Sequence, residues 1–244
     1  MLSRYLVLLL FTLIVNHLHA APAIDIVRFN NTSTYYAGGS ISIHINPKGV
    51  FNLTNSFTLE LSNASGSFVS PVVIGTVNDF FTPIINGVIP ASTSLGTGYK
   101  LRIKATTGPT ISVETNAFAI ANAPSTALQT PEVVLTGSLA KINCLSSNDN
   151  NPMVGWLTQT ITDKTPTPER ILEIKNYNTT ESYTVTIVDL FSATSTSLYN
   201  QTVSSLGRFT FPSDKPTGYY TIEIERKLGN VSTIRSLIYL FNTG

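Results

Sequence analysis

The stretch SISIHIN, residues 40–46, decides the fold class. Isoleucine occupies every second position, at Ile41, Ile43 and Ile45, and polar residues fill the positions between. Because successive side chains of a β-strand point to opposite faces, this alternation predicts a strand with one buried and one solvent-facing side. The isoleucines are expected in a core. His44 lies on the other face, where the pattern predicts an ordinary exposed strand histidine.

Similar β-branched and aromatic runs recur along the chain, separated by Gly, Pro, Asn and Ser, as is typical of antiparallel sandwiches. The first series shows no sustained 3.6-residue apolar period. Its expected strands are 24–29, 40–45, 57–61, 72–77, 84–89, 99–105 and 111–120. A second series is expected at 132–135, 139–145, 154–161, 171–174, 183–188, 197–203, 208–211, 219–225 and 232–241.

Two blocks of sequence occur in both parts of the chain. SFTLEL at 56–61 matches SYTVTI at 182–187, and TGYKLRI at 97–103 matches TGYYTIE at 217–223, in the same order. In the second pair the Gly permits a tight turn, and the Tyr can pack its ring while its hydroxyl bonds the backbone. We therefore predict an all-β chain of two tandem Ig-like β-sandwich domains, at 21–122 and 131–244, joined by a linker at 123–130.

The first twenty residues are typical of a signal peptide. Arg4 precedes an apolar run at 5–15 that is shorter than a membrane-spanning helix requires, and the small residues Ala20 and Ala21 follow. We predict a signal peptide at 1–20 and a mature chain without a membrane span, secreted to an extracellular or cell-surface location. Cys144 lies too far from the cleavage point for a bacterial lipid anchor.

Composition excludes several classes of partner. The chain has 15 basic and 14 acidic residues, 12% charged residues in all, and 25 Ser and 33 Thr. A net charge of +1 argues against nucleic acid or anionic lipid as a partner. The single Cys144 excludes an internal disulfide framework and a multi-cysteine zinc site, and its alternating neighbours predict an inert buried thiol.

Few residues are available for catalysis or metal binding. Once the signal peptide is removed, His44 is the one histidine left for a catalytic triad or a metal site. The close acidic pairs are Glu223/Glu225, predicted on an exposed strand face without the burial that raises a carboxyl pKa, and Glu169/Glu173. The segment SSNDNN at 146–151 has one carboxylate and is interpreted as a polar turn, not a calcium site. The sequence predicts no enzyme, metal or cofactor.

Two surface features are candidate binding sites. Lys100, Arg102 and Lys104 share the outer face of one expected strand, and a solvated face is the favoured interpretation. A charge-complementary contact between this face and Glu223/Glu225 is conceivable. Trp156 is the candidate ligand-binding residue, because an exposed Trp can stack on a sugar ring, although packing in a core is favoured.

Several motifs of the first domain carry a family resemblance. They are YAGGS at 36–40, GVF at 49–51, NSFTLELS at 55–62, GSF at 66–68, VIG at 73–75, IP at 89–90 and GYKLRI at 98–103. In this order and spacing they resemble the Ig-like modules repeated in large secreted surface proteins of the Bacteroidota, over residues 23–120. The resemblance implies an Ig-like sandwich, an extracellular or cell-surface setting, a role as spacer or adhesive unit, and no catalytic residues.

A second, weaker resemblance covers residues 166–240. The motifs PTP at 166–168, ILEI at 171–174, TVTIVDL at 184–190, GYYTI at 218–222 and GNV at 229–231 are similar to the C-terminal sorting domain of type IX secretion substrates. Thr167 stands where that family has Asn, and the last residues lack its basic ending. The second domain is thus expected to be either a structural sandwich or a sorting domain.

These observations predict a non-catalytic secreted or cell-surface protein, a structural or adhesive spacer built of Ig-like modules. Its partner would be an extracellular protein or a glycan that the sequence does not identify. Two alternatives stay open: a carbohydrate-binding module, and a type IX secretion cargo whose last domain is the sorting signal.

Overall fold

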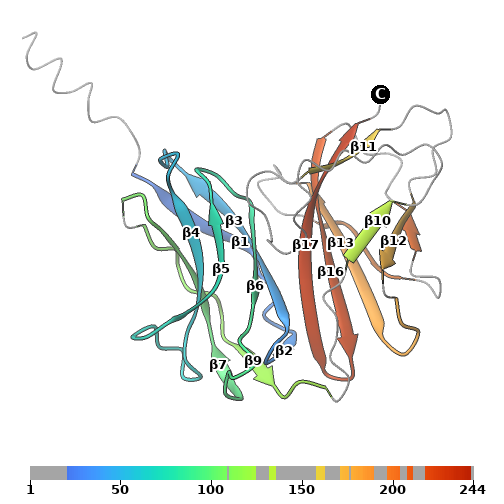
Figure 1. Cartoon of the computed structure of the whole chain (residues 1–244), viewed down its shortest axis with the longest axis horizontal. Coiled ribbons are helices and arrows are strands. Elements are labelled where there is room, and N and C mark those ends of the chain that lie inside the picture. The colour runs from blue at the N-terminus through green and yellow to red at the C-terminus, as the bar shows by residue number, and fades with distance from the viewer. Residues whose placement is uncertain are drawn as a thin grey trace, which may run out of the picture.

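The computed structural model describes residues 21–108, 110–124, 132–135, 158–162, 171–175, 177–189, 197–203, 208–210 and 218–242. The described regular structure consists of β-strands throughout (Figure 1), so the prediction of an all-β chain is confirmed. We call residues 21–124 the N-terminal half and the described residues from 132 to 242 the C-terminal half. Within these ranges no helix is long and apolar enough to cross a membrane. The predicted signal peptide, Cys144, Trp156, Glu169 and the turn at 146–151 lie outside the described residues.

Two three-stranded antiparallel sheets pack face to face in the N-terminal half. One has the order β1-β3-β6 and the other β5-β4-β8. Their bounds are β1 (Ala23–Arg28), β3 (Ser40–Lys48), β4 (Ser56–Leu61), β5 (Val72–Asn78), β6 (Ile84–Val88) and β8 (Leu101–Ala105). Ile41, Ile43 and Ile45 lie buried between the sheets with Phe57, Leu59, Leu61, Leu101 and Ile103. The expected buried face of 40–46 is therefore confirmed.

The sequence pattern predicted one strand at 99–105, and the structure divides it at Lys100. β7 (Gly96–Tyr99) pairs with β9 (Phe118–Ala121), whereas β8 pairs with β4. At the break, the Lys100 amide donates to Ser62 Oγ at 2.8 Å, and the Ser62 amide donates to the Lys100 carbonyl at 3.0 Å. These two bonds hold the chain while it passes from one sheet to the other.

The strand expected at 111–120 is also shorter than predicted, since β9 covers its last part alone. Residues 110–115 instead follow the edge of β8, where Ser112 Oγ and Thr115 Oγ1 accept from the amides of Ile103 and Leu101 at 2.8 and 2.9 Å. Side-chain hydroxyls replace ladder bonds there, which is the competition that Ser and Thr bring to regular structure.

One sheet runs through both halves of the chain, in the order β14-β13-β16-β17-β2-β9-β7, with β11 also paired to β17. Its further strands are β2 (Thr34–Tyr36), β11 (Thr158–Thr162), β13 (Ser182–Asp189), β14 (Ser197–Thr202), β16 (Gly218–Leu228) and β17 (Val231–Asn242). The short β2 was not predicted. It joins the halves, because it pairs in parallel with β17 through Val231–Thr34 and Ser232–Tyr35.

The sheets form four layers. A small sheet of β10 (Glu132–Leu135), β12 (Ile171–Lys175) and β15 (Arg208–Thr210) packs on the large sheet of the C-terminal half, where Ile174 of β12 joins Val185, Ile187, Ile222 and Ile224 in one apolar cluster. On its other face the large sheet meets β1-β3-β6, with β17 beside β3 and β6 (Figure 1). The two outer gaps between layers are thus filled by apolar side chains, and the middle gap lies between the halves.

Candidate functional site

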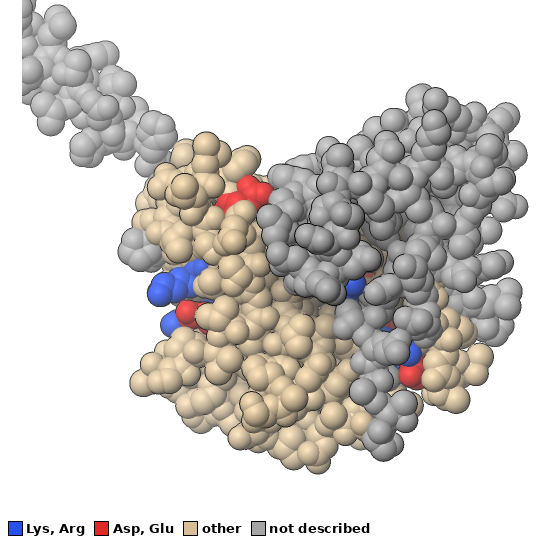
Figure 2. Space-filling view, in the orientation of Figure 1, with Lys and Arg blue, Asp and Glu red and all other residues tan. Residues whose placement is uncertain are grey.

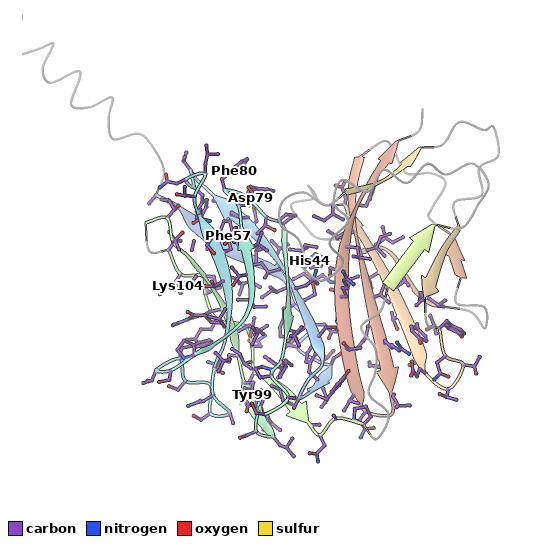
Figure 3. The ribbon with its side chains drawn as sticks, in the orientation of Figure 1. His44, Phe57, Asp79, Phe80, Tyr99 and Lys104 are labelled. Carbon is purple, nitrogen blue, oxygen red and sulfur yellow. The ribbon has the colours of Figure 1, made fainter. Side chains whose placement is uncertain are left out.

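The middle gap is lined by buried polar side chains, which we call the polar joint. β3 and β6 contribute Ser40, Ser42, His44 and Asn86, and β16 and β17 contribute Glu223, Glu225, Ser232, Thr233 and Ser236. Each of these residues is at most 9% exposed. Figure 3 shows His44 on the side of its sheet that faces β16 and β17.

The prediction that His44 is exposed is wrong, because the residue is only 5% exposed. Alternation correctly separated the two faces of β3, yet both faces are covered, one by β4 and β8 and the other by the C-terminal half. One sequence signal pointed to this outcome. The polar face of 40–44 carries two serines and one histidine, and it lacks the Lys and Glu that are common on faces open to water.

The prediction that Glu223 and Glu225 lie on an exposed strand face is also wrong. Their register on β16 places them on the face that meets the N-terminal half, where they are 4% and 9% exposed. A charge-complementary contact between the halves does exist, but its cation is Arg28 of β1, whose Nη2 lies 3.0 Å from Glu223 Oε1. Glu225 accepts from the hydroxyls of Ser33 and Ser232.

His44 lies at the centre of the joint. Its Nε2 is 3.0 Å from Ser236 Oγ and 3.6 Å from Glu223 Oε2, and Ser42 Oγ donates to Ser236 Oγ at 2.8 Å. Burial lowers the pKa of His44 from its ordinary value, against the opposing effect of Glu223, and Arg28 lowers it further. The imidazole is therefore neutral at pH 7.

β2 and β11 pair with the two ends of one edge of β17. Between these two paired segments, side chains of the N-terminal half provide hydrogen-bond partners for the β17 backbone. Asn86 Nδ2 donates to the Ser236 carbonyl at 2.9 Å, and the Ser236 amide donates to Asn86 Oδ1 at 3.0 Å, so one carboxamide replaces a missing strand partner. Ser40 Oγ likewise donates to the Ile234 carbonyl at 3.1 Å. Sequence reasoning missed Asn86, Ser236 and Arg28, because no local pattern marks a residue that pairs across 150 or more positions.

The His44–Ser236–Glu223 set is unlike a catalytic triad. A triad requires the acid to orient one imidazole nitrogen while the other faces the nucleophile, whereas here Nε2 faces both groups. Ser236 is fully buried, so no substrate reaches its hydroxyl. The polar contacts of this cluster instead hold the two halves together.

The row Lys100, Arg102 and Lys104 does not take part in the joint. Arg102 Nε lies 2.7 Å from Glu60 Oε2, and its guanidinium stacks over Phe68 at 4.4 Å from the ring centroid. Lys100 Nζ lies 2.9 Å from Glu114 Oε2. Acidic atoms lie beside basic atoms at the left edge of Figure 2, and the two ion pairs support the interpretation as a solvated and locally neutralised face.

An open cavity of about 560 Å³ lies at the end of β4, in the N-terminal half. Its wall includes Tyr99 and is rich in residues with hydroxyl and amide groups, namely Ser62, Asn63, Ser65, Ser70, Ser92, Thr93 and Ser94. Several of these groups already bond within the wall: Asn63 Oδ1 accepts from Ser65 Oγ at 2.8 Å, and Tyr99 OH donates to the Ser94 carbonyl at 2.6 Å. The described residues contain no cluster of three or more metal-ligating side chains.

No protein-family model and no curated protein matches the chain. Similar solved structures include the FN1-FN3 domains of chicken CNTN1 (12% identity, TM-score 0.29, 92% of this chain and 69% of that chain). They also include three N-terminal domains of the highly immunogenic outer capsid protein of bacteriophage RB49 (14%, 0.23, 91% and 59%) and the BSP domain of a biofilm associated protein (12%, 0.30, 93% and 30%). TM-scores this low do not indicate a shared topology, so these similarities carry no argument about function.

Proposed function

We propose that the chain is a non-catalytic secreted or cell-surface protein whose two Ig-like modules act together as a rigid structural or adhesive spacer. The observation that supports this proposal most directly is the junction between the halves. A shared sheet crosses it through β2 and β17, and the buried polar joint lies beside that crossing.

The rigidity that we propose for the two halves follows from the kind of contact between them. Domains of one chain move relative to each other unless their interface is large and specific. Here a strand ladder, the Arg28–Glu223 ion pair and the Asn86–Ser236 bonds fix the relative position of the halves along several directions. Ile234 of β17 also packs into the apolar cluster of the N-terminal half. A spacer needs a fixed relative position of its modules, because its role is to keep a constant distance between its two ends.

Residual dipolar couplings of the chain from Ala21 onward at pH 7.5 test the rigidity. Amides of β3 and β6 and amides of β13 and β16 are expected to report the same alignment tensor. Asn86→Ala, which removes the bonds to Ser236, should separate the two tensors. The matched variant Asn46→Ala alters an exposed residue of β3 and should not. Different tensors in the unmodified chain would refute the rigid spacer.

The predicted location has a separate test. We expect residues 1–20, fused to a reporter in a secreting host, to direct its export, and amino-terminal sequencing of the exported chain to begin at Ala21 or Pro22. Retention of the reporter inside the cell would contradict the proposed secretion.

A carbohydrate-binding function is the second candidate, supported by the hydroxyl-lined cavity. Phe80 is the one exposed aromatic residue among those whose burial the structure describes, so no aromatic platform is present in that part of the chain. A polysaccharide pull-down should therefore compare the chain with Trp156→Ala and with the cavity variant Ser92→Trp. Binding that neither substitution reduces would exclude both sites.

The sorting-domain alternative needs a transfer experiment. Deleting residues 168–244 would remove β17, which contributes Ile234 to the core of the N-terminal half, and would destabilise the cargo as well. Residues 166–244 should instead be attached to a foreign secreted reporter in a type IX-competent host. Surface delivery of the reporter supports a sorting role, and periplasmic retention excludes it.

A further inference from the structure

His44 has an unusual position in the chain. It is the one histidine after the predicted signal peptide, since His17 and His19 precede residue 20. It is also buried in the joint between the halves, within hydrogen-bond distance of Ser236 Oγ at 3.0 Å. The side chain that titrates closest to physiological pH therefore lies where the two halves are held together.

We propose that mild acid loosens the contact between the two halves, and that protonation of His44 in the polar joint is the trigger. The proposal goes beyond the rigid spacer: it makes that rigidity a property of neutral pH. It requires that the closed joint be less stable with a charged imidazole than with a neutral one. The hydrogen bonds and the surrounding charges are two separate arguments for this difference.

The hydrogen bonds favour the neutral ring. Ser42 Oγ donates to Ser236 Oγ, so in the tautomer with Nε2 unprotonated the Ser236 hydroxyl can donate its proton to His44 Nε2. The neutral ring can therefore accept this proton at Nε2 and complete the chain of donors. Protonation turns Nε2 into a donor, so that it and Ser42 both point a proton at Ser236 Oγ while the Ser236 hydroxyl loses its acceptor. A buried donor without an acceptor is costly.

The charged groups around His44 do not offset this cost. Glu223 of β16 faces the ring at 3.6 Å, but its carboxylate is already paired with Arg28 of β1 at 3.0 Å. Asn86 of β6 and Ser42 and Ser236 contribute neutral dipoles, and Glu225 is occupied by Ser33, Ser232 and the ammonium group of Lys227. Burial lowers the pKa of His44 more than Glu223 raises it, and Arg28 lowers it too.

The direction of the pH effect follows from linkage. Because the closed joint holds His44 with a pKa below the ordinary value of about 6.5, the closed form binds fewer protons than the open form. Closure is complete above that ordinary value and weakens as the pH falls from there toward the pKa of the buried ring. Within this window the ratio of closed to open forms falls by up to about tenfold for each pH unit.

Two measurements on the chain from Ala21 onward test the proposal. The imidazole ¹³C and ¹⁵N shifts of His44, a single set of resonances, should titrate below pH 6.5. Hydrogen exchange by mass spectrometry, corrected for intrinsic rates, should show that peptides from β3 and β17 lose protection between pH 7.5 and 5 while peptides from β4 and β8 keep theirs. A normal His44 titration, or equal protection of β3 and β17 at both pH values, overturns the proposal.

Matched variants separate His44 from the carboxylates. His44→Gln keeps an uncharged acceptor toward Ser236 and should abolish the pH dependence of exchange in β17, whereas Asp25→Asn, at an exposed position of β1, should leave it unchanged. If His44→Gln responds to acid as the unmodified chain does, the trigger is not His44. The alignment experiment at pH 7.5 remains a separate test of the spacer, so failure of one proposal is distinguishable from failure of the other.

Discussion

Buried tyrosines of both halves bond to a residue five positions earlier. Tyr35 OH donates to the Asn30 carbonyl at 2.9 Å, and Tyr99 OH donates to the Ser94 carbonyl at 2.6 Å. The expectation that the Tyr of the TGY motif packs its ring and bonds the backbone is confirmed for Tyr99, a residue that is 3% exposed and whose ring packs against Phe118. Such bonds fix the loop before a strand, because they satisfy a polar atom at the edge of a core.

Tyr183 of the C-terminal half uses the same spacing with an additional partner. The Asn178 amide donates to its hydroxyl at 3.0 Å, and the hydroxyl donates to Glu181 Oε2 at 2.8 Å. Burial and the bond to Glu181 raise the pKa of Tyr183 to about 12. Glu181 also pairs with Arg226, so the tyrosine is part of a closed network.

Tyr183→Phe is expected to alter the alkaline stability of the chain. The folded state holds the neutral phenol, so its contribution is complete below the ordinary pKa of about 10 and is lost as the pH rises from there toward about 12. Urea titrations between pH 9 and 11 should show that the unmodified chain loses up to about 1.4 kcal/mol more per pH unit above 10 than the variant. Equal slopes for both chains would contradict the assigned network, and Tyr177→Phe serves as the control.

Asn86→Ala is expected to lower the free energy of unfolding by about 2–4 kcal/mol, since it removes two hydrogen bonds and leaves the Ser236 amide and carbonyl buried without partners. Asn46→Ala, at an exposed position of β3, should change it by less than about 0.5 kcal/mol. Urea denaturation at pH 7.5 measures both. A similar loss in the two variants would mean that the Asn86 contacts do not stabilise the joint.

At the scale of strands, two glycines permit a close crossing of β5 and β6. A Cβ on Gly75 would lie 2.5 Å from the Asn86 carbonyl oxygen, and one on Gly87 would lie 3.0 Å from the Ile74 carbonyl oxygen. The edges of the two sheets of the N-terminal half therefore approach closely, with backbone atoms of Asn86 and Gly87 directly against Gly75. This crossing also positions Asn86, whose side chain leaves β6 on the opposite face, toward β17.

Gly75→Ala tests this crossing. Backbone atoms cannot yield as a flexible side chain does, so β5 and β6 must separate, at a cost of about 1–3 kcal/mol. Because β6 carries Asn86, hydrogen exchange should increase in β17 as well as in β5 and β6. The neighbouring exposed substitution Thr76→Ala should leave exchange in β17 unchanged. Faster exchange confined to β5 would show that the crossing does not support the joint.

Period-two patterning predicted most strands because each has an apolar face and a polar face, and that property is local. Residues 132–135 were predicted with the bounds that β10 has, and 232–241 differs from β17 by one residue at each end. The errors share one cause. The exposure of His44 and Glu223, the existence of β2 and the break at Lys100 depend on which sheet covers or pairs with a strand, and those partners are distant in sequence.

At the scale of the whole molecule, the layers differ in what fills the gaps between them. Apolar clusters fill the two outer gaps, and the middle gap holds the polar joint, with Ile234 and the pair Tyr36–Val231 as its apolar contacts. Polar joints give specificity of position, and they contribute less stability per area than apolar ones. Each half is thus expected to form its own core, and the contact with the other half is expected to add a few kcal/mol to its free energy of unfolding.

Residues 21–124 expressed alone test this dependence. The fragment lacks Ile234, which belongs to its apolar cluster, and it exposes His44 and Asn86, which lose their partners on Ser236. Loss of one buried aliphatic contact and several hydrogen bonds should lower its free energy of unfolding by about 3–5 kcal/mol relative to the same half in the full chain. Tryptophan is absent from the fragment, so tyrosine fluorescence and circular dichroism would follow urea unfolding. If the fragment unfolds at the same urea concentration as the full chain, the two halves are independently stable modules. The polar face of β3 would then orient the halves without stabilising either of them.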